Sequence, residues 1–133
     1  MTEKSSLIRW FETLTIEDVP IVGGKNASLG EMFSSLKEEG IPVPDGFATT
    51  SEAYWAFLDA NDLRDEMSRY LDMLRRDEQS LAWVGRAIRR LLLGSEFPDY
   101  LSREIVAAYR ELCDRYDQED VDVAVRSSAT AED

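Results

Sequence analysis

Two glycines, a lysine and a following helical pattern are the residues of this chain best suited to chemistry. Gly23 and Gly24 let the backbone turn tightly and approach a ligand closely. Lys25 adds a cation at once, and Leu29, Met32, Phe33 and Leu36 then fall at helical spacing. A helix N-terminus offers free N–H groups and a favourable dipole to an anion, so the stretch predicts a phosphate site. The alternative is an ordinary loop before a helix, with Lys25 a solvated charge.

Arg126 is a second candidate for holding phosphate. It follows Val121–Val125, whose alternating pattern predicts a strand with one buried face, and it precedes Ser127 and Ser128. Arginine suits this role because its planar guanidinium binds oxyanions through two hydrogen bonds at once. The alternative is a structural arginine on the surface.

Three more arginines lie on the outer side of a helix predicted to begin after Ser80 and end at Gly94. They are Arg86, Arg89 and Arg90. They could bind an anion, but the many nearby acids favour a solvated helix face.

Composition limits the kinds of partner. Hydrophobic residues make up 44% of the 133 residues and charged residues 32%, which is typical of a soluble globular chain. The net charge of −12 repels nucleic acid and anionic lipid, so we expect neither as a partner, and a phosphate site would depend on local cations. No apolar run is long enough for a membrane span. Residues 1–6 lack the apolar core of a signal peptide.

The counts of cysteine and histidine exclude several kinds of chemistry. One cysteine cannot form an internal disulfide and fits a reducing compartment, so we expect a cytoplasmic protein. The chain has no histidine. It therefore cannot carry a Ser-His-Asp or Cys-His site, histidine zinc ligands or a phosphohistidine of its own.

The pattern as a whole predicts a helix-dominant α/β fold with a small sheet. We expect four to five helices packed on strands from three regions, which are Leu7–Phe11, Phe47–Thr49 and Val121–Val125. Residues 13–20 read as a loop. Lys25 and Arg126 are expected on the same side of the sheet.

Capping signals set the expected helix limits. The helix after the glycine turn should end at Gly40. Thr49 and Glu52 are spaced as a capping box for the next helix, which should reach about Asn61. A further helix should cover Leu63 to Leu74. Pro98 suits the first position of the last helix.

Three blocks of the sequence resemble the N-terminal region of the phosphoenolpyruvate synthase (pyruvate, water dikinase) family. In chain order they are Val22–Met32 (VGGKNASLGEM), Val43–Thr50 (VPDGFATT) and Ala124–Asp133 (AVRSSATAED). Together they span nearly the whole chain, in the family's order, which makes them far more specific than any one block. Residues 62–120 between them carry little that is specific to the family.

The resemblance implies that residues 1–133 are a partial domain, the first subdomain of an ATP-grasp-like nucleotide-binding domain. The family transfers a phosphoryl group from ATP to a histidine on a separate swivelling domain of the same polypeptide. That histidine then phosphorylates pyruvate in a C-terminal domain, giving phosphoenolpyruvate, AMP and phosphate, as in gluconeogenesis. The implied cofactors are ATP and Mg²⁺.

The resemblance also implies roles for individual residues. Lys25 and Arg126 match the family's lysine and arginine that contact ATP phosphates, and Gly23 and Gly24 would let the backbone come close. Ser127 and Ser128 are weaker candidates, which would place Arg126 rather than touch the ligand. No residue of this chain is expected to be catalytic or to bind metal, and Glu132 and Asp133 are not assigned as metal ligands.

The same resemblance implies that the chain is a piece of a longer enzyme. It stops where the family continues, and the adenine-binding segment, the magnesium carboxylates, the phosphohistidine and the pyruvate site are absent from it. We therefore expect no dikinase activity from the chain alone, and weak ATP binding or none. Two alternatives are a module of a related phosphotransferase, such as one that inactivates rifampicin, and a stand-alone adaptor without catalysis.

Overall fold

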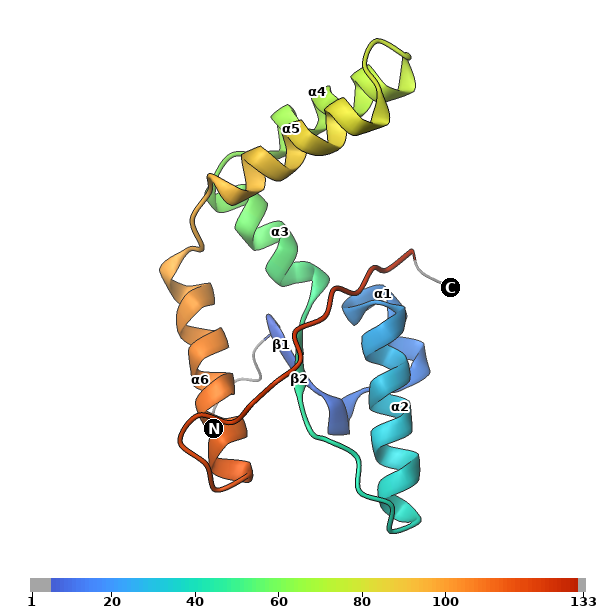
Figure 1. The fold of residues 1–133 in the computed structure, drawn as a ribbon, viewed down its shortest axis with the longest axis vertical. Coiled ribbons are helices and arrows are strands. Elements are labelled where there is room, and N and C mark those ends of the chain that lie inside the picture. Colours follow the sequence, from blue (N-terminus) through green and yellow to red (C-terminus); the bar gives the residue numbers. More distant parts are fainter. Residues whose placement is uncertain (1–5, 132–133) are drawn as a thin grey trace. The chain divides into compact units, whose positions relative to one another are not determined.

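The computed structural model describes residues 6–131, which form two compact units. The first unit contains the chain up to Tyr54 and from Tyr100 onward, and the second is Trp55–Asp99. Residues 1–5, Glu132 and Asp133 lie outside the described part. The expectations about a signal peptide at the N-terminus and about Glu132 and Asp133 as metal ligands fall on these residues. Along the chain the elements are β1 (Ile8–Trp10), the 3-10 helices η1 (Phe11–Thr13) and η2 (Ile16–Asp18), α1 (Val19–Val22), α2 (Gly24–Glu38), β2 (Phe47–Thr49), α3 (Ser51–Ala60), α4 (Arg64–Arg75), α5 (Leu81–Leu93) and α6 (Asp99–Arg115), as labelled in Figure 1.

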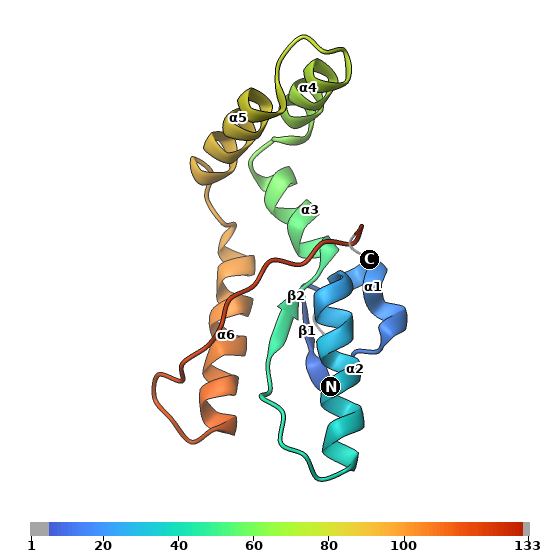
Figure 2. The same ribbon diagram turned by 45° about the vertical axis from the view of Figure 1, so that its right-hand side comes forward.

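The helix-dominant class with a small sheet is confirmed. Five of the six α-helices among the described residues are ten residues or longer. β1 and β2 form an antiparallel pair in which Ile8 faces Thr49 and Trp10 faces Phe47, and Figure 2 shows the pair between α6 and α2. No helix within residues 6–131 has the length and apolar character that crossing a bilayer requires.

The prediction of a third strand at Val121–Val125 is wrong. This segment is extended but pairs with neither strand, and the sheet described has only β1 and β2. An alternating pattern shows only that a segment can form a strand, and a strand also needs a neighbouring edge for its backbone hydrogen bonds. The hydroxyl of Tyr109 donates to the carbonyl of Val121 at 2.8 Å, while the side chain of Val125 is 92% exposed. Desolvation raises the pKa of that tyrosine above its usual value.

Most of the expected helix limits are confirmed. Gly40 follows the end of α2 with a φ of 78°, the left-handed conformation that glycine tolerates best. The hydroxyl of Ser80 accepts a hydrogen bond of 3.1 Å from the amide of Trp83 and caps α5, which ends at Gly94. α6 begins at Asp99, one residue after Pro98, a difference within the usual uncertainty of a helix end.

The cap of α3 is Thr50 and not Thr49. The amide of Ala53 donates to Thr50 Oγ1 at 3.3 Å, and that hydroxyl donates to the carbonyl of Ser6 at 2.6 Å. Thr49 cannot serve because it belongs to β2, where it is paired with Ile8. The capping-box spacing therefore identified the right junction, but one residue too early.

Residues 13–20 hold more structure than the expected loop. Thr15 and Asp18 form a capping box, in which the amide of Thr15 donates to Asp18 Oδ2 at 2.9 Å. Pro20 lies in the first turn of α1, where its missing N–H costs nothing. Single turns such as these contain too few residues to produce a periodic pattern.

The core of the first unit forms where α1 and α2 meet β2. Leu14, Val22, Ala27 and Ala48 are buried together. Gly30 lets α2 approach the chain at Leu14, because a Cβ at this glycine would overlap the Cβ of Leu14 and lie 3.1 Å from the carbonyl oxygen of Phe11. Gly30, the last glycine of the Val22–Met32 block, thus has a packing role.

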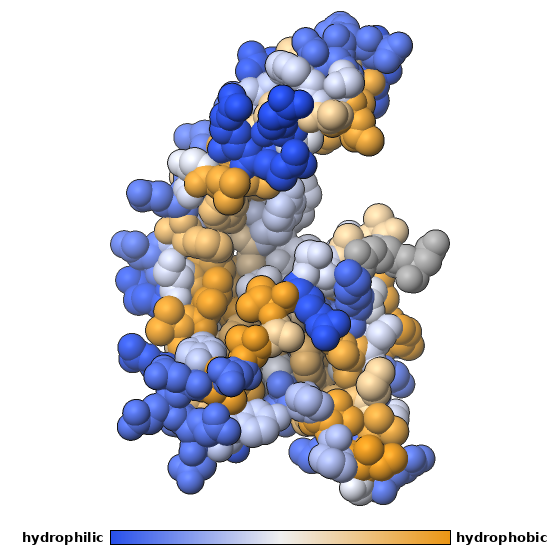
Figure 3. Space-filling view, viewed as in Figure 1, coloured by the Kyte–Doolittle hydropathy of each residue, from blue (hydrophilic) through white to orange (hydrophobic). Residues whose placement is uncertain are grey.

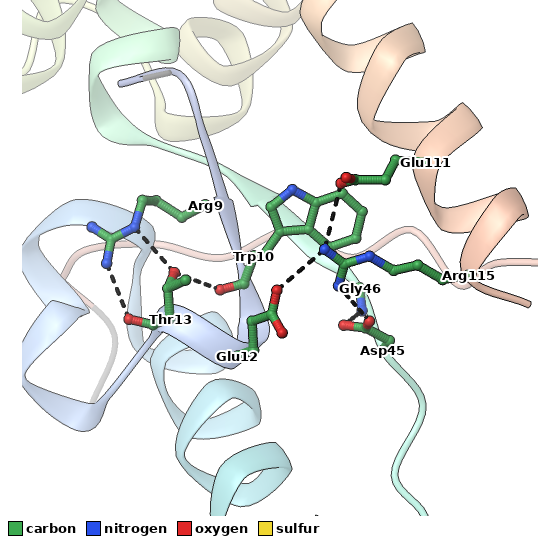
Figure 4. Close-up of polar contacts among 8 residues, drawn as sticks. All are labelled: Arg9, Trp10, Glu12, Thr13, Asp45, Gly46, Glu111 and Arg115. Atoms are coloured by element: carbon green, nitrogen blue, oxygen red, sulfur yellow. Dashed lines mark hydrogen bonds and ion pairs between the residues drawn. The ribbon is translucent and has the colours of Figure 1, made fainter. Parts of the chain in front are cut away.

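Arg115, near the end of α6, ties three parts of the first unit together (Figure 4). Its guanidinium donates to Asp45 Oδ2 at 2.8 Å and to Glu12 Oε1 at 3.1 Å, and lies 3.8 Å from the centre of the Trp10 ring. Burial lowers the pKa of Arg115, but the hydrogen bond and charge of Asp45, together with Glu12, outweigh it and raise that pKa. Arg115 is therefore a permanent cation that holds α6 against β1.

Asp45 lies at the centre of the second family-like block and has a structural role. Its Oδ1 accepts from the amide of Gly46 at 2.8 Å, and its own amide donates to the hydroxyl of Tyr116 at 2.6 Å. The carbonyl of Gly46 in turn accepts from the amide of Phe11 at 3.0 Å. The turn at Asp45-Gly46 is thereby fixed between η1 and the end of α6.

Two glycine-to-alanine changes within helices should have opposite effects on stability. Gly30→Ala should lower the free energy of unfolding by about 1–3 kcal/mol, since its methyl group has no room beside Leu14. Gly85→Ala should raise it by about 0.5–1 kcal/mol, because its Cβ would meet only the mobile end of Arg89. Urea unfolding, with amide exchange read separately in each unit, measures both. A neutral Gly30→Ala would contradict the packing role.

Candidate functional site

Gly23 joins two helices through a conformation that other residues rarely adopt. Its φ is 85° and its amide donates to the carbonyl of Val19 at 2.8 Å, which closes α1. Its own carbonyl accepts from the amide of Ala27 at 3.0 Å, the first hydrogen bond of α2. A positive φ is costly for residues with a Cβ, so the turn between the two helices requires glycine here.

The segment around Ser128 packs directly on this glycine turn, as the path of the chain after α6 in Figures 1 and 2 shows. The amide of Gly24 donates to the carbonyl of Ala129 at 3.2 Å, and the amide of Asn26 donates to Ser128 Oγ at 3.4 Å. A Cβ on Gly23 would overlap Ser128 Oγ and lie 2.9 Å from the amide nitrogen of Ala129. The close approach expected for a ligand is thus made by the chain itself.

This packing changes what the N-terminus of α2 can offer an anion. Two of its first-turn amides, those of Gly24 and Asn26, already donate to Ala129 and Ser128. The side-chain amide of Asn26 is also used, since it donates to the carbonyl of Val22 at 3.0 Å. The N-terminus of α2 therefore already uses these two backbone donors within the chain.

Lys25 and Arg126 are both exposed and flank the contact between the two segments. Lys25 lies between Gly24 and Asn26, and Arg126 lies two residues before Ser128. The hydrogen bond from Asn26 to Ser128 measures 3.4 Å, so the covalent spans on either side limit the two Cα atoms to no more than about 16 Å apart. The structure thus brings the backbones of the two candidate cations into one region.

The remaining candidates divide by exposure. Ser128 is half-buried and bonded to the glycine turn, whereas Ser127 is exposed. The sequence analysis missed Asn26 and Ala129, which make the polar contacts of the turn. Asn26 lies within the Val22–Met32 block, and its polarity at the start of a helix was the one local signal available.

The described residues do not form a metal site. Within residues 6–131, no three carboxylate, thiolate or imidazole side chains lie close enough together to hold a metal ion. The structure accordingly gives no ligands to which Mg²⁺ can be assigned.

Residues 19–133 match the family described as "Pyruvate phosphate dikinase, AMP/ATP-binding domain". The match covers most of the chain, and the glycine turn, Lys25 and Arg126 all fall within it. The chain therefore belongs to this family of AMP/ATP-binding domains.

The chain is also similar to proteins named phosphoenolpyruvate synthase. It is 53% identical over 125 residues to the protein of Neisseria meningitidis, covering 93% of this chain and 16% of that protein. It is 46% identical to the protein of Aquifex aeolicus, over 98% of this chain and 15% of that protein. For Escherichia coli the identity is 43%, over 97% of this chain and 16% of that protein. The chain spans about one sixth of the length of these relatives.

Replacing Gly23 by alanine should release the segment at Ser128. The new methyl group would overlap Ser128 Oγ, so the amides of Gly24 and Asn26 should lose their acceptors and exchange faster with solvent. Amide hydrogen exchange followed by NMR on the 133-residue chain measures this.

Gly40→Ala is the matched control. Gly40 has a similar φ of 78° but nothing within 4 Å of its would-be Cβ, so the control carries the backbone strain without the overlap. The amides of Gly24 and Asn26 should exchange faster in Gly23→Ala than in Gly40→Ala. Equally slow exchange in the two variants would show that Ser128 does not lie close to Gly23.

Proposed function

We propose that this chain supplies part of the ATP phosphate site of an enzyme of the phosphoenolpyruvate synthase (pyruvate, water dikinase) kind. Its family, and relatives with that name over nearly its whole length, support the proposal. The observation that carries it is the contact of Ser128 and Ala129 with the glycine turn, which keeps Lys25 and Arg126 in one region.

Lys25 and Arg126 would bind and orient the triphosphate. Phosphoryl transfer depends on fixed positive charges that neutralise the phosphate oxygens and hold the transferred group in line. The arginine fork suits two oxygens at once, while the lysine acts as a single charge. Gly23 and Gly24 shape the turn, and Ser127 and Ser128 place Arg126 in the same region.

The remaining parts of the reaction belong elsewhere in such an enzyme. The phosphoryl group would pass from ATP to a histidine and then to pyruvate, giving phosphoenolpyruvate, AMP and phosphate. This chain has no histidine, so the acceptor histidine must be supplied by another region. Mg²⁺, when bound, would screen the phosphate charges. We place the enzyme in the cytoplasm, acting in gluconeogenesis.

A chimera tests these roles. The matching N-terminal segment of the Neisseria meningitidis relative, 53% identical, would be replaced by this chain, and pyruvate-dependent formation of AMP from ATP measured. Lys25→Ala and Arg126→Ala should each slow phosphoryl transfer to the histidine by roughly a hundredfold, the scale for losing one preorganised charge contact. Folding should be intact, because both side chains are exposed.

The controls separate a specific contact from a change in net charge. Lys37→Ala, at the far end of α2, and Arg76→Ala, in the second unit, remove exposed cations that are assigned no role and should leave turnover near the chimera's own rate. The 133-residue chain alone should show no activity and no ATP binding in the micromolar range by calorimetry. Near-normal turnover of both Lys25→Ala and Arg126→Ala would remove the assigned roles.

A further inference from the structure

Helix α5 in the second unit concentrates positive charge with which no carboxylate of the described residues pairs directly. Arg86, Arg89 and Arg90 all lie on α5, and α5 has no acidic residue, unlike the other helices of ten residues or longer described here. Figure 3 shows the strongly hydrophilic side chains gathered over α5. In a chain with a net charge of −12, such a helix is a local exception.

Three acids of the second unit pair with arginines outside α5. Asp59 pairs with Arg64, Glu66 with Arg69 at 3.5 Å, and Asp72 with Arg75 at 3.4 Å. Among the described residues, no carboxylate forms an ion pair with the three arginines of α5.

A groove between α4 and α5 lies beside two of these arginines. Its volume is about 500 Å³, and its lining includes Arg86, Arg90, Trp83, Tyr70 and Glu66, the last of which pairs with Arg69 at 3.5 Å. The two arginines are one helical turn apart and therefore lie on the same face. The rings of Tyr70 and Trp83 meet edge to face with centres 5.9 Å apart, and the side chain of Trp83 is 38% exposed. The groove thus combines two guanidinium groups with an accessible aromatic surface.

We propose that this groove binds a small organic phosphate, with the phosphate on Arg86 and Arg90 and its apolar or aromatic part against Trp83. Two guanidinium forks match the several oxygens of a phosphate dianion. The volume falls in the range of small-molecule sites. A long polyanion is disfavoured, because the rest of the chain would repel it. The inference is independent of the function proposed for the glycine turn.

Binding of 1-naphthyl phosphate to the 133-residue chain, measured by calorimetry, tests this site. We expect a dissociation constant below about 1 mM. The double change Arg86→Ala with Arg90→Ala should raise it at least about tenfold, because charge-assisted hydrogen bonds are lost. The fold should persist, since both residues are exposed on a helix and alanine is a strong helix former.

A matched variant distinguishes the groove from general electrostatics. Arg103→Ala with Arg110→Ala removes the same charge from exposed positions on α6 and should leave the affinity unchanged. Arg86→Lys with Arg90→Lys keeps the charge but loses the planar guanidinium groups, so the affinity for 1-naphthyl phosphate should fall. Trp83→Ala should weaken the binding of 1-naphthyl phosphate while leaving the binding of inorganic phosphate unchanged.

Three results would overturn the proposal. They are no binding up to 1 mM, an equal loss of affinity in the α6 control, and native affinity in the double lysine variant.

Discussion

The arrangement of the first unit depends on how closely Ser128 and Ala129 approach Gly23. Only a residue without a Cβ allows this contact, because any side chain at Gly23 would occupy the space of Ser128 Oγ. The contact joins residues about a hundred positions apart, through the amides of Gly24 and Asn26. It also uses two of the amide donors that a helix N-terminus would otherwise present to an anion. Lys25 and Arg126, on either side of the contact, are the cations that we propose for a nucleotide phosphate.

Two of the family-like blocks have structural roles that complement one another. Asp45, in the second block, holds Arg115 and Gly46 and so fixes the end of α6 beside β1. Gly30, in the first block, lets α2 pack against Leu14. The segment that returns to the glycine turn starts from the end of α6, so the anchoring of α6 helps to define where Ser128 can lie.

Local signals predicted much of this fold, and long-range contacts account for what they missed. Gly40, Ser80 and Gly94 mark helix limits because capping depends on a few neighbouring residues. Val121–Val125 was expected to be a strand, yet pairing depends on a partner edge that no local pattern reveals. The capping-box spacing favours Thr49, because the pairing of Thr49 with Ile8 in β2 cannot be seen in the sequence. For the site, residue type and family resemblance indicate Lys25 and Arg126. The contact of Ser128 with the glycine turn joins residues 102 positions apart, and no local pattern reveals it.

The central claim is that Ser128 lies against the glycine turn and thereby keeps Lys25 and Arg126 in one region. Nuclear Overhauser effects between the α protons of Gly23 and the β protons of Ser128, in the 133-residue chain in solution, test it most directly. We expect clear cross-peaks, together with contacts from Gly24 to Ala129. Their absence, with residues 126–131 showing only sequential contacts, would contradict it.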